Sequence, residues 1–166
     1  MIEVRWHGRA GQGAKTASQL LAAAALERGM FVQSFPDYGP ERSGAPMRAY
    51  TRIDDAPIRR RYGITEPTVV VVLDESLLRE VDVREGLRDH GVLIVNSERP
   101  IPGARSVPAS RIAAAGAGYV NVVMLGAVGA ALREPLDLLL AVAEAKGVAA
   151  EDVAAGYHAL SRRWAA

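Results

Sequence analysis

The feature that most constrains the fold is a run of mainly β-branched residues in the middle of the chain, Thr-Val-Val-Val-Val-Leu at residues 68–73. The run does not alternate between apolar and polar residues, so a strand formed from it has to be covered on both faces. Strands of this kind are typical of parallel sheets. The run therefore predicts a layered α/β fold with a mostly parallel sheet.

The rest of the chain fits an alternation of strands and helices. Residues 14–28 carry apolar residues at the spacing of one buried helical face and are followed by Gly29, a typical helix end. A short helix is expected within residues 75–89, and residues 109–166 are expected to be helical, with breaks near residues 133–135 and at Gly147. The other expected strands are residues 2–7, 31–35, 47–53, 92–95 and 106–108. No linker or repeat interrupts the pattern, so residues 1–166 are expected to form one domain with a helical C-terminal part.

The composition excludes several classes of function. The chain has no cysteine, so it cannot itself form a disulfide, use a thiolate nucleophile or hold an iron–sulfur cluster through cysteine. Its 20 basic and 19 acidic residues give a net charge of +1, which argues against nucleic acid or a membrane surface as a main partner. The first residues lack the pattern of a signal peptide, and the longest apolar tract is too short to cross a bilayer. A cytoplasmic protein is therefore expected.

A glycine-rich loop follows the first expected strand and precedes the first expected helix. It contains Gly8, Arg9, Gly11, Gln12 and Gly13. Glycines let the backbone approach an anion closely, and the free N–H groups and dipole at a helix start favour a phosphate. Ligands of parallel α/β folds bind at the carboxyl ends of the strands, which is where this loop lies. The sequence therefore predicts an anion site here, with a tight turn that binds nothing as the alternative.

Two known phosphate-binding motifs come close to this loop without matching it. The dinucleotide fingerprint G-x-G-x-x-G requires glycine at position 10, where the chain has Ala10, and an acidic residue at the end of the second strand, where it has Phe35 and Pro36. The P-loop pattern fails because Ala14 stands before Lys15. A free-standing dinucleotide-binding protein and a nucleotide-hydrolysing enzyme with a modified P-loop are therefore alternatives rather than the leading interpretation.

Two further segments give the glycine loop a specific context. They are Pro-Asp-Tyr-Gly-Pro-Glu-Arg-Ser-Gly-Ala-Pro at residues 36–46 and Asn-Val-Val-Met-Leu-Gly-Ala at residues 121–127. With the loop at residues 7–13, they resemble the motifs of the gamma subunit of 2-oxoacid:ferredoxin oxidoreductases. The pyruvate branch is the nearer match, because of residues 44–46 and 51–55. The resemblance extends from residue 2 to about residue 144.

The resemblance implies a Rossmann-like fold and a subunit that is not catalytic alone. These enzymes oxidatively decarboxylate a 2-oxoacid with coenzyme A and give acyl-CoA, carbon dioxide and electrons for an external ferredoxin. Thiamine diphosphate is implied between the alpha and beta subunits. The [4Fe-4S] clusters are implied in the beta subunit and in a ferredoxin-like delta subunit, in agreement with the lack of cysteine here. The implied role of this chain is to help bind coenzyme A and to close the active site.

The resemblance also implies roles for individual residues. The amides of residues 8–13 are expected to hold a phosphate of coenzyme A, assisted by Arg9 or Lys15. Arg42 offers a planar fork for a phosphate, and the alternative is that its loop docks on the catalytic subunits. Asn121 is expected to face the coenzyme, and the alternatives are a helix cap or a hydrogen bond in the core.

No catalytic or metal-binding residue is assigned from the sequence. His7, His90 and His158 have no partner pattern that indicates a metal site or a catalytic triad. Ala10 stands where related loops usually have glycine, and it would be strained if this position needs a positive φ.

Overall fold

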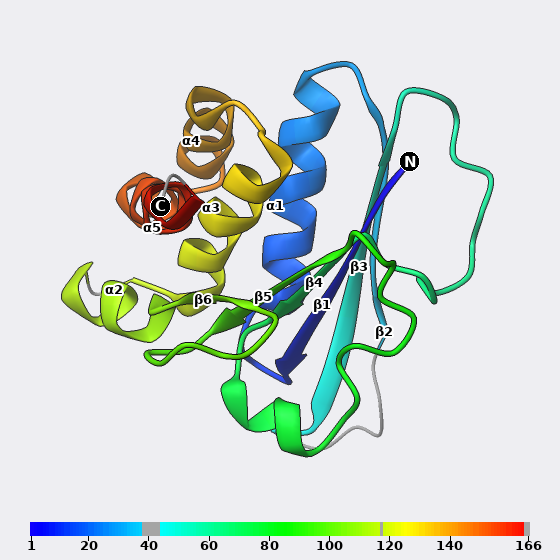
Figure 1. Cartoon of the computed structure of the whole chain (residues 1–166). Helices are drawn as coiled ribbons and strands as arrows, with labels where there is room; N and C mark the ends of the chain where they lie inside the picture. Colours follow the sequence, from blue (N-terminus) through cyan, green and yellow to red (C-terminus); the bar gives the residue numbers. More distant parts are fainter. Residues whose placement is uncertain (38–43, 117, 165–166) are drawn as a thin grey trace.

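The structure, a computed structural model, describes residues 1–37, 44–116 and 118–164. In this part of the chain the helices α1 to α5 lie on one side of a six-stranded sheet (Figure 1). The elements in chain order are β1 (Ile2–Arg9), α1 (Ala14–Glu27), β2 (Phe31–Asp37), β3 (Pro46–Asp54), β4 (Val69–Val72), the 3-10 helix η1 (Glu75–Arg79), β5 (Val92–Asn96), β6 (Arg105–Val107), α2 (Ala109–Gly116), α3 (Val120–Leu132), α4 (Leu136–Ala145) and α5 (Ala150–Trp164). None of these described helices is both long and apolar enough to cross a membrane.

The sheet has the strand order β2-β3-β1-β4-β5-β6. β1, β4, β5 and β6 pair in parallel, whereas β3 lies between β1 and β2 and runs antiparallel to both. The predicted layered α/β fold with a mostly parallel sheet is confirmed, and each predicted strand agrees to within two residues. Since β2 is antiparallel to β3, it runs parallel to β1, so the carboxyl ends of β1, β2, β4 and β5 lie at one edge.

The C-terminal part is helical as predicted, but it has one break more than the sequence analysis expects. α2 ends at Gly116 and α3 begins at Val120. A Cβ atom at Gly118 would lie 1.5 Å from Oδ2 of Asp152, so the backbone here approaches α5 more closely than a residue with a side chain allows. The end of α2 and the start of α3 therefore lie at a tertiary contact, which helical periodicity alone does not reveal.

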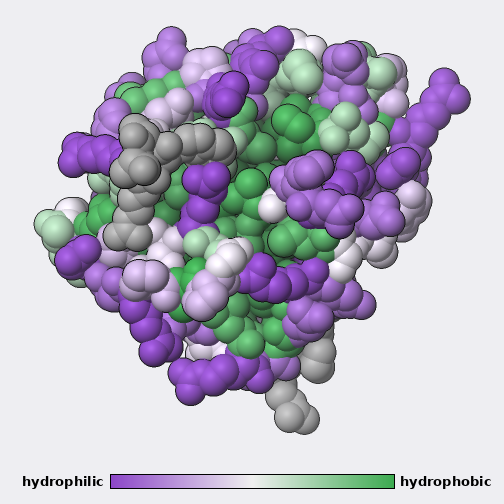
Figure 2. Space-filling model, in the orientation of Figure 1, coloured by the Kyte–Doolittle hydropathy of each residue, from purple (hydrophilic) through white to green (hydrophobic). Residues whose placement is uncertain are grey.

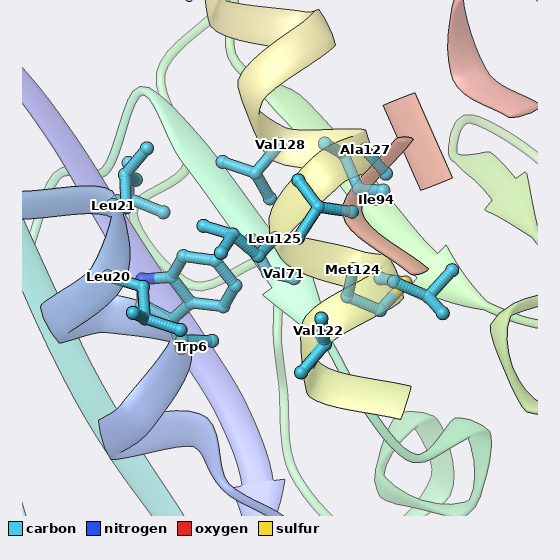
Figure 3. Close-up of a cluster of buried hydrophobic side chains, with 14 of the residues drawn as sticks. Trp6, Leu20, Leu21, Val71, Ile94, Val122, Met124, Leu125, Ala127 and Val128 are labelled. Atoms are coloured by element: carbon cyan, nitrogen blue, oxygen red, sulfur yellow. The ribbon is translucent and has the colours of Figure 1, made fainter. Parts of the chain in front are cut away.

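The larger part of the core lies between the sheet and the helices. Trp6 of β1 packs between Leu20 of α1 and Leu125 of α3 (Figure 3). Its indole N–H donates a 3.1 Å hydrogen bond to Oγ1 of Thr51, so the one polar atom of this fully buried ring is satisfied. α3 is buried along most of its length, from Asn121 to Gly129. It is therefore a central element of the core and not a surface helix.

The opposite face of the sheet is apolar over β4 and β5. Val70 and Val72 of β4 join Leu93 of β5 in a second cluster, which is closed by Leu77 of η1 and by Val83. Val69 and Val71 point the other way, into the larger core. The prediction that residues 68–73 form a strand covered on both faces is confirmed.

The same face is polar and buried over β1 and β3. Arg52 has no exposed surface; its Nε donates to Oε1 of Glu3 at 2.9 Å, and its terminal nitrogen donates to the carbonyl of Tyr62 at 2.8 Å. Its guanidinium also lies over the rings of Phe35 and Tyr62, at 5.8 and 5.4 Å from their centroids. Arg52 therefore ties the loop that follows β3 to the sheet.

α3 and α5 cross at two glycines. A Cβ at Gly126 would lie 1.9 Å from the carbonyl oxygen of Val153, and a Cβ at Gly156 would lie 1.8 Å from that of Val123. Each helix thus presents a glycine to the backbone of the other, with no room for a methyl group on either side. This contact holds α3 at a fixed distance from α5.

Replacing Gly126 by alanine is expected to destabilise the protein by about 2–4 kcal/mol, because the new Cβ has to displace the α5 backbone. Gly29→Ala is the matched control. A Cβ at Gly29 meets nothing within 4 Å, and only its φ of +78° opposes alanine, so that change is expected to cost about 1 kcal/mol. Urea unfolding of both variants measures the difference, and equal losses would contradict the close helix crossing.

His7 is a buried histidine on the polar face. Its Nε2 accepts a 3.1 Å hydrogen bond from Nε of Arg5, so this nitrogen carries no proton. Burial, followed by the positive charges of Arg5 and Arg48, lowers the pKa of His7 from 6.5 to about 3. The folded protein therefore keeps His7 neutral in the range where the unfolded chain takes up a proton.

The stability of the folded chain is expected to fall as the pH drops below 6.5, because only the unfolded state binds the extra proton at His7. The loss is expected to be about 1.5 kcal/mol between pH 6.5 and pH 5, from a slope near 1.4 kcal/mol per pH unit. Urea unfolding at the two pH values measures it. His7→Gln is expected to remove most of the loss, and the exposed His90→Gln is expected to retain it. A loss that persists in His7→Gln would assign the effect to other groups.

Candidate functional site

A cavity of about 990 Å³ lies at the carboxyl edge of the sheet, a size suited to a cofactor. Its wall is formed by the glycine loop, the residues that follow β4 and β5, the start of α3 and the segment before α5. Gly11, Gln12 and Gly13 line it together with Asn121. The structure therefore brings four of the predicted site residues to one place.

Two glycines of the loop adopt backbone angles that other residues rarely reach. The φ angle is +93° at Gly11 and +79° at Gly13. Among the described residues Arg133 alone has a positive φ without being glycine, so Ala10 is not strained. The Ala10 N–H donates a 3.0 Å hydrogen bond to the carbonyl of Ala45. Alanine at this position therefore leaves the loop undisturbed.

The loop leads into α1 without capping it. Gly13 occupies the N-cap position, no side chain of the described residues bonds to the first amides, and the first turn has no acidic residue. The helix's own bonding starts with the N–H of Ala17, which donates to the carbonyl of Gly13 at 3.0 Å. The preceding amides and the positive end of the helix dipole are therefore available to an anion. Thr16, exposed on this turn, also lines the cavity.

Asn121 joins α3 to the glycine loop. Its Nδ2 donates a 3.2 Å hydrogen bond to the carbonyl of Gly13, and only 7% of its surface is exposed. A Cβ at Gly13 would lie 2.5 Å from this nitrogen, so the contact requires glycine for reasons of space as well as of φ. The bond joins the N-terminal ends of α1 and α3. It therefore places the uncapped starts of both helices at the same cavity.

Arg9 has protein acceptors around its guanidinium and does not line the cavity. It donates to Oδ2 of Asp74 at 3.1 Å, to the carbonyl of Gly44 at 3.1 Å and to Oγ of Ser76 at 2.6 Å, and it pairs with Glu80. The Glu80 carboxylate is the main cause of a raised pKa at Arg9. These bonds join the glycine loop to the segment just before β3 and to η1. A direct bond from Arg9 to a ligand phosphate stays a prediction that this geometry does not favour.

Gln12 and Asp74 fix the loop from the side of β4. The Gln12 side chain accepts from the N–H of Arg9 at 2.8 Å and donates to Oδ2 of Asp74 at 3.0 Å. Partial burial would raise the pKa of Asp74, but hydrogen bonds from Ser76 and Gln12 and the charge of Arg9 together lower it to about 2. Asp74 is therefore a charged anchor for the loop and not a proton acceptor at neutral pH.

The residues at the ends of β5 and β2 have separate roles. Asn96 lines the cavity and caps α2, since its Oδ1 accepts a 3.0 Å hydrogen bond from the N–H of Ser110. Asp37 lies at a different cavity, of about 450 Å³, and accepts a 2.8 Å hydrogen bond from the hydroxyl of Tyr50. Arg42, predicted to bind a phosphate, lies outside the described residues.

Two residues that line the cavity, and one buried residue beside its wall, were missed by sequence reasoning. Thr16 stands in the first turn of α1, Tyr119 is the N-cap residue of α3, and Asp152 is a buried carboxylate of α5 whose Oδ2 has no hydrogen-bond partner among the described residues. The signal that could have pointed to the last two is the pair of glycines, Gly116 and Gly118, directly before Tyr119.

The arrangement is suited to binding and offers little for catalysis. The described residues that line the cavity include no histidine, lysine or arginine, and the pKa of Asp74 is too low for a general base. In residues 1–37, 44–116 and 118–164 no three His, Asp or Glu side chains are placed to hold a metal ion. What the cavity provides is a set of main-chain donors together with amide and hydroxyl side chains, and the three carboxylates in its wall, Asp74, Glu75 and Glu98, are each paired with an arginine.

The sequence is similar to those of known oxidoreductase subunits. It is 51% identical over 133 residues to pyruvate synthase subunit PorC of Methanothermobacter thermautotrophicus, covering 76% of this chain and 74% of that protein. It is 61% identical over 99 residues to the pyruvate/ketoisovalerate oxidoreductases common subunit gamma of Thermococcus kodakarensis, covering 60% of this chain and 54% of the relative.

Solved structures agree with these relatives. The pyruvate oxidoreductase subunit PORC of Thermotoga maritima superposes with a TM-score of 0.78 at 41% identity, covering 97% of this chain and 93% of that one. A 2-oxoglutarate:ferredoxin oxidoreductase of Magnetococcus marinus, with 2-oxoglutarate, coenzyme A and succinyl-CoA bound, shares the fold (TM-score 0.73, 18% identity, 99% of this chain and 30% of that one). The family model described as pyruvate ferredoxin/flavodoxin oxidoreductase matches residues 3–155. The chain therefore belongs to the pyruvate ferredoxin/flavodoxin oxidoreductase family.

Proposed function

We propose that this chain is the gamma-type subunit of a 2-oxoacid:ferredoxin oxidoreductase, with pyruvate as the favoured substrate of the complex. In this proposal the cavity at the start of α1 binds a phosphate of coenzyme A and helps to close the active site. Thiamine diphosphate belongs to the alpha and beta partner subunits. The [4Fe-4S] clusters belong to the beta and delta partner subunits, since this chain has no cysteine for a cluster.

The observation that carries the proposal is the uncapped start of α1 beside Asn121. The side chain of an N-cap residue normally accepts a hydrogen bond from one of these amides. At α1 no side chain of the described residues does so. Gly13 leaves room for the loop and for the Asn121 amide at the same point. An anion of the ligand would complete the missing hydrogen bonds, and a phosphate has the charge and acceptors for it. The relatives named as pyruvate synthase and pyruvate/ketoisovalerate oxidoreductase subunits support the reaction class.

A free-standing dinucleotide-binding protein, the alternative from the sequence, finds less support. Such proteins use an acidic residue to accept hydrogen bonds from the ribose hydroxyls. Asp74 stands at the end of β4, but it already accepts from Arg9, Gln12 and Ser76. The carboxylate at the end of β4, the strand that pairs in parallel with β1, is therefore engaged within the protein.

The Thr16→Asp change tests the anion site in the assembled complex. An aspartate in the first turn suits the helix dipole, so α1 is expected to stay folded, but its charge would repel a phosphate. We expect the KM for coenzyme A to rise about tenfold or more while the KM for the 2-oxoacid stays the same, a change of about 1.4 kcal/mol in binding. Steady-state kinetics of the complex measure both constants.

Two control variants separate charge from shape. Thr16→Val removes the hydroxyl without adding charge and is expected to have a smaller effect than Thr16→Asp. Gln19→Asp places the same charge at an exposed position that does not line the cavity, and it is expected to leave the KM for coenzyme A unchanged. If Thr16→Asp and Gln19→Asp behave alike, α1 does not hold the coenzyme.

The proposed partners lead to a second test. Hydrophobic residues lie exposed between hydrophilic ones in the middle of one face of the molecule (Figure 2), as expected of a surface that a partner covers. A tagged copy purified from its native cells is expected to bring with it a thiamine-diphosphate-binding chain and a cysteine-rich chain, and the mixture to oxidise pyruvate with coenzyme A. The chain purified alone is expected to be inactive. Oxidation of a 2-oxoacid by the isolated chain would refute the subunit role.

A further inference from the structure

The rim of the cavity carries an aromatic side chain for which the fold gives no packing role. Tyr119 lines the cavity and is 73% exposed, the largest value among the exposed large hydrophobic residues of the described chain. An aromatic ring this exposed leaves its face free for a ligand to cover. The residues beside it in the cavity wall, Val120 and Val148, add apolar surface next to the ring.

The backbone that carries this ring is held firmly. The Tyr119 carbonyl accepts hydrogen bonds from the N–H groups of Val122 at 3.0 Å and Val123 at 3.2 Å, at the first turn of α3. On its other side Asp152, 4% exposed, packs against Gly118. Burial raises the pKa of Asp152, and a hydrogen bond from the Tyr119 N–H partly offsets this. The ring is thus presented to the cavity from a fixed point and not from a loose loop.

Tyr119 and the proposed anion site at the start of α1 belong to the same cavity. Asn121, which bonds to the carbonyl of Gly13, follows Tyr119 by two residues. Two residues span at most about 7 Å, so the Cα of Tyr119 is close to the glycine loop. The phosphate and the base of a single nucleotide are separated by a distance of this order, because only a ribose stands between them. A phosphate at the start of α1 can therefore place its base against Tyr119.

We propose that Tyr119 stacks on the adenine base of the bound coenzyme, so that the site recognises an adenine nucleotide and not merely a phosphate. This rests on the proposed function and adds a recognition element to it. Every base has a flat face that can stack on an aromatic ring, whereas the pantetheine arm of coenzyme A has none.

The test measures inhibition of the assembled complex by three probes that compete with coenzyme A. ADP carries base and phosphates, 4′-phosphopantetheine carries a phosphate and the arm, and inorganic pyrophosphate carries phosphates alone. Tyr119→Ala is expected to weaken ADP about tenfold and to leave the other two within twofold of the wild type. Tyr119→Phe keeps the ring, so this variant is expected to be inhibited by the three probes as strongly as the wild type.

Each other outcome has a defined meaning. An equal loss for all three probes, or no loss for ADP, would overturn the stacking role. Dissociation of Tyr119→Ala from its partner subunits, seen by size-exclusion chromatography, would assign the ring to an interface and overturn it as well. Thr16→Asp, measured with the same probes, is expected to weaken all three through charge. If Thr16→Asp weakens the inhibition by all three probes and Tyr119→Ala does not weaken that by ADP, the stacking role is refuted and the coenzyme site stands. If Thr16→Asp weakens the inhibition by none of them, the proposed coenzyme site itself is refuted.

Discussion

The position of α3 is the constraint on which both the core and the site depend. Contacts too close for any side chain fix it at two places: Gly126 meets the backbone of α5, and Gly13 meets the amide of Asn121. The first contact sets how far α3 lies from α5, and the second ties its start to the glycine loop. A helix held at both points moves little, so the amides at the start of α1 and the side chains at the start of α3 keep a constant spacing.

The charges at the edge of the sheet are balanced so that an anion is tolerated there. Three acidic residues line the cavity, and each has an arginine as partner. The pairs are Asp74–Arg9, Glu75–Arg99 and Glu98–Arg111. Pairing and hydrogen bonds lower the pKa values of Asp74 and Glu75, so these carboxylates stay charged, but their fields are compensated locally. The helix dipoles therefore act on a ligand without a net opposing charge.

Sequence reasoning predicted the fold well, because the relevant signals are local. The apolar run 68–73, the periodicity of 14–28 and Gly29 each act within one element, and the structure confirms them. The glycine loop was also visible, because its glycines lie close together in the sequence, between an expected strand and an expected helix.

What the sequence could not show is how distant segments meet. The engagement of Arg9 depends on Gly44 and on η1, and the break before α3 depends on Asp152. Nothing in the sequence distinguishes Thr16 from other helix residues, and only the structure shows that it lines the cavity.

A site built mainly from main-chain donors explains why its signature lies in glycines and not in charged residues. Amide N–H groups are present whatever the side chain is, so sequence can determine only whether the backbone takes the required shape and whether a ligand can reach it. Gly11 and Gly13 supply the shape, and Gly13 also leaves the space for Asn121. Side chains then add selectivity, since amides bind any anion but do not distinguish one phosphate compound from another. In the proposed site the discrimination has to come from side chains at the rim of the cavity, such as Tyr119.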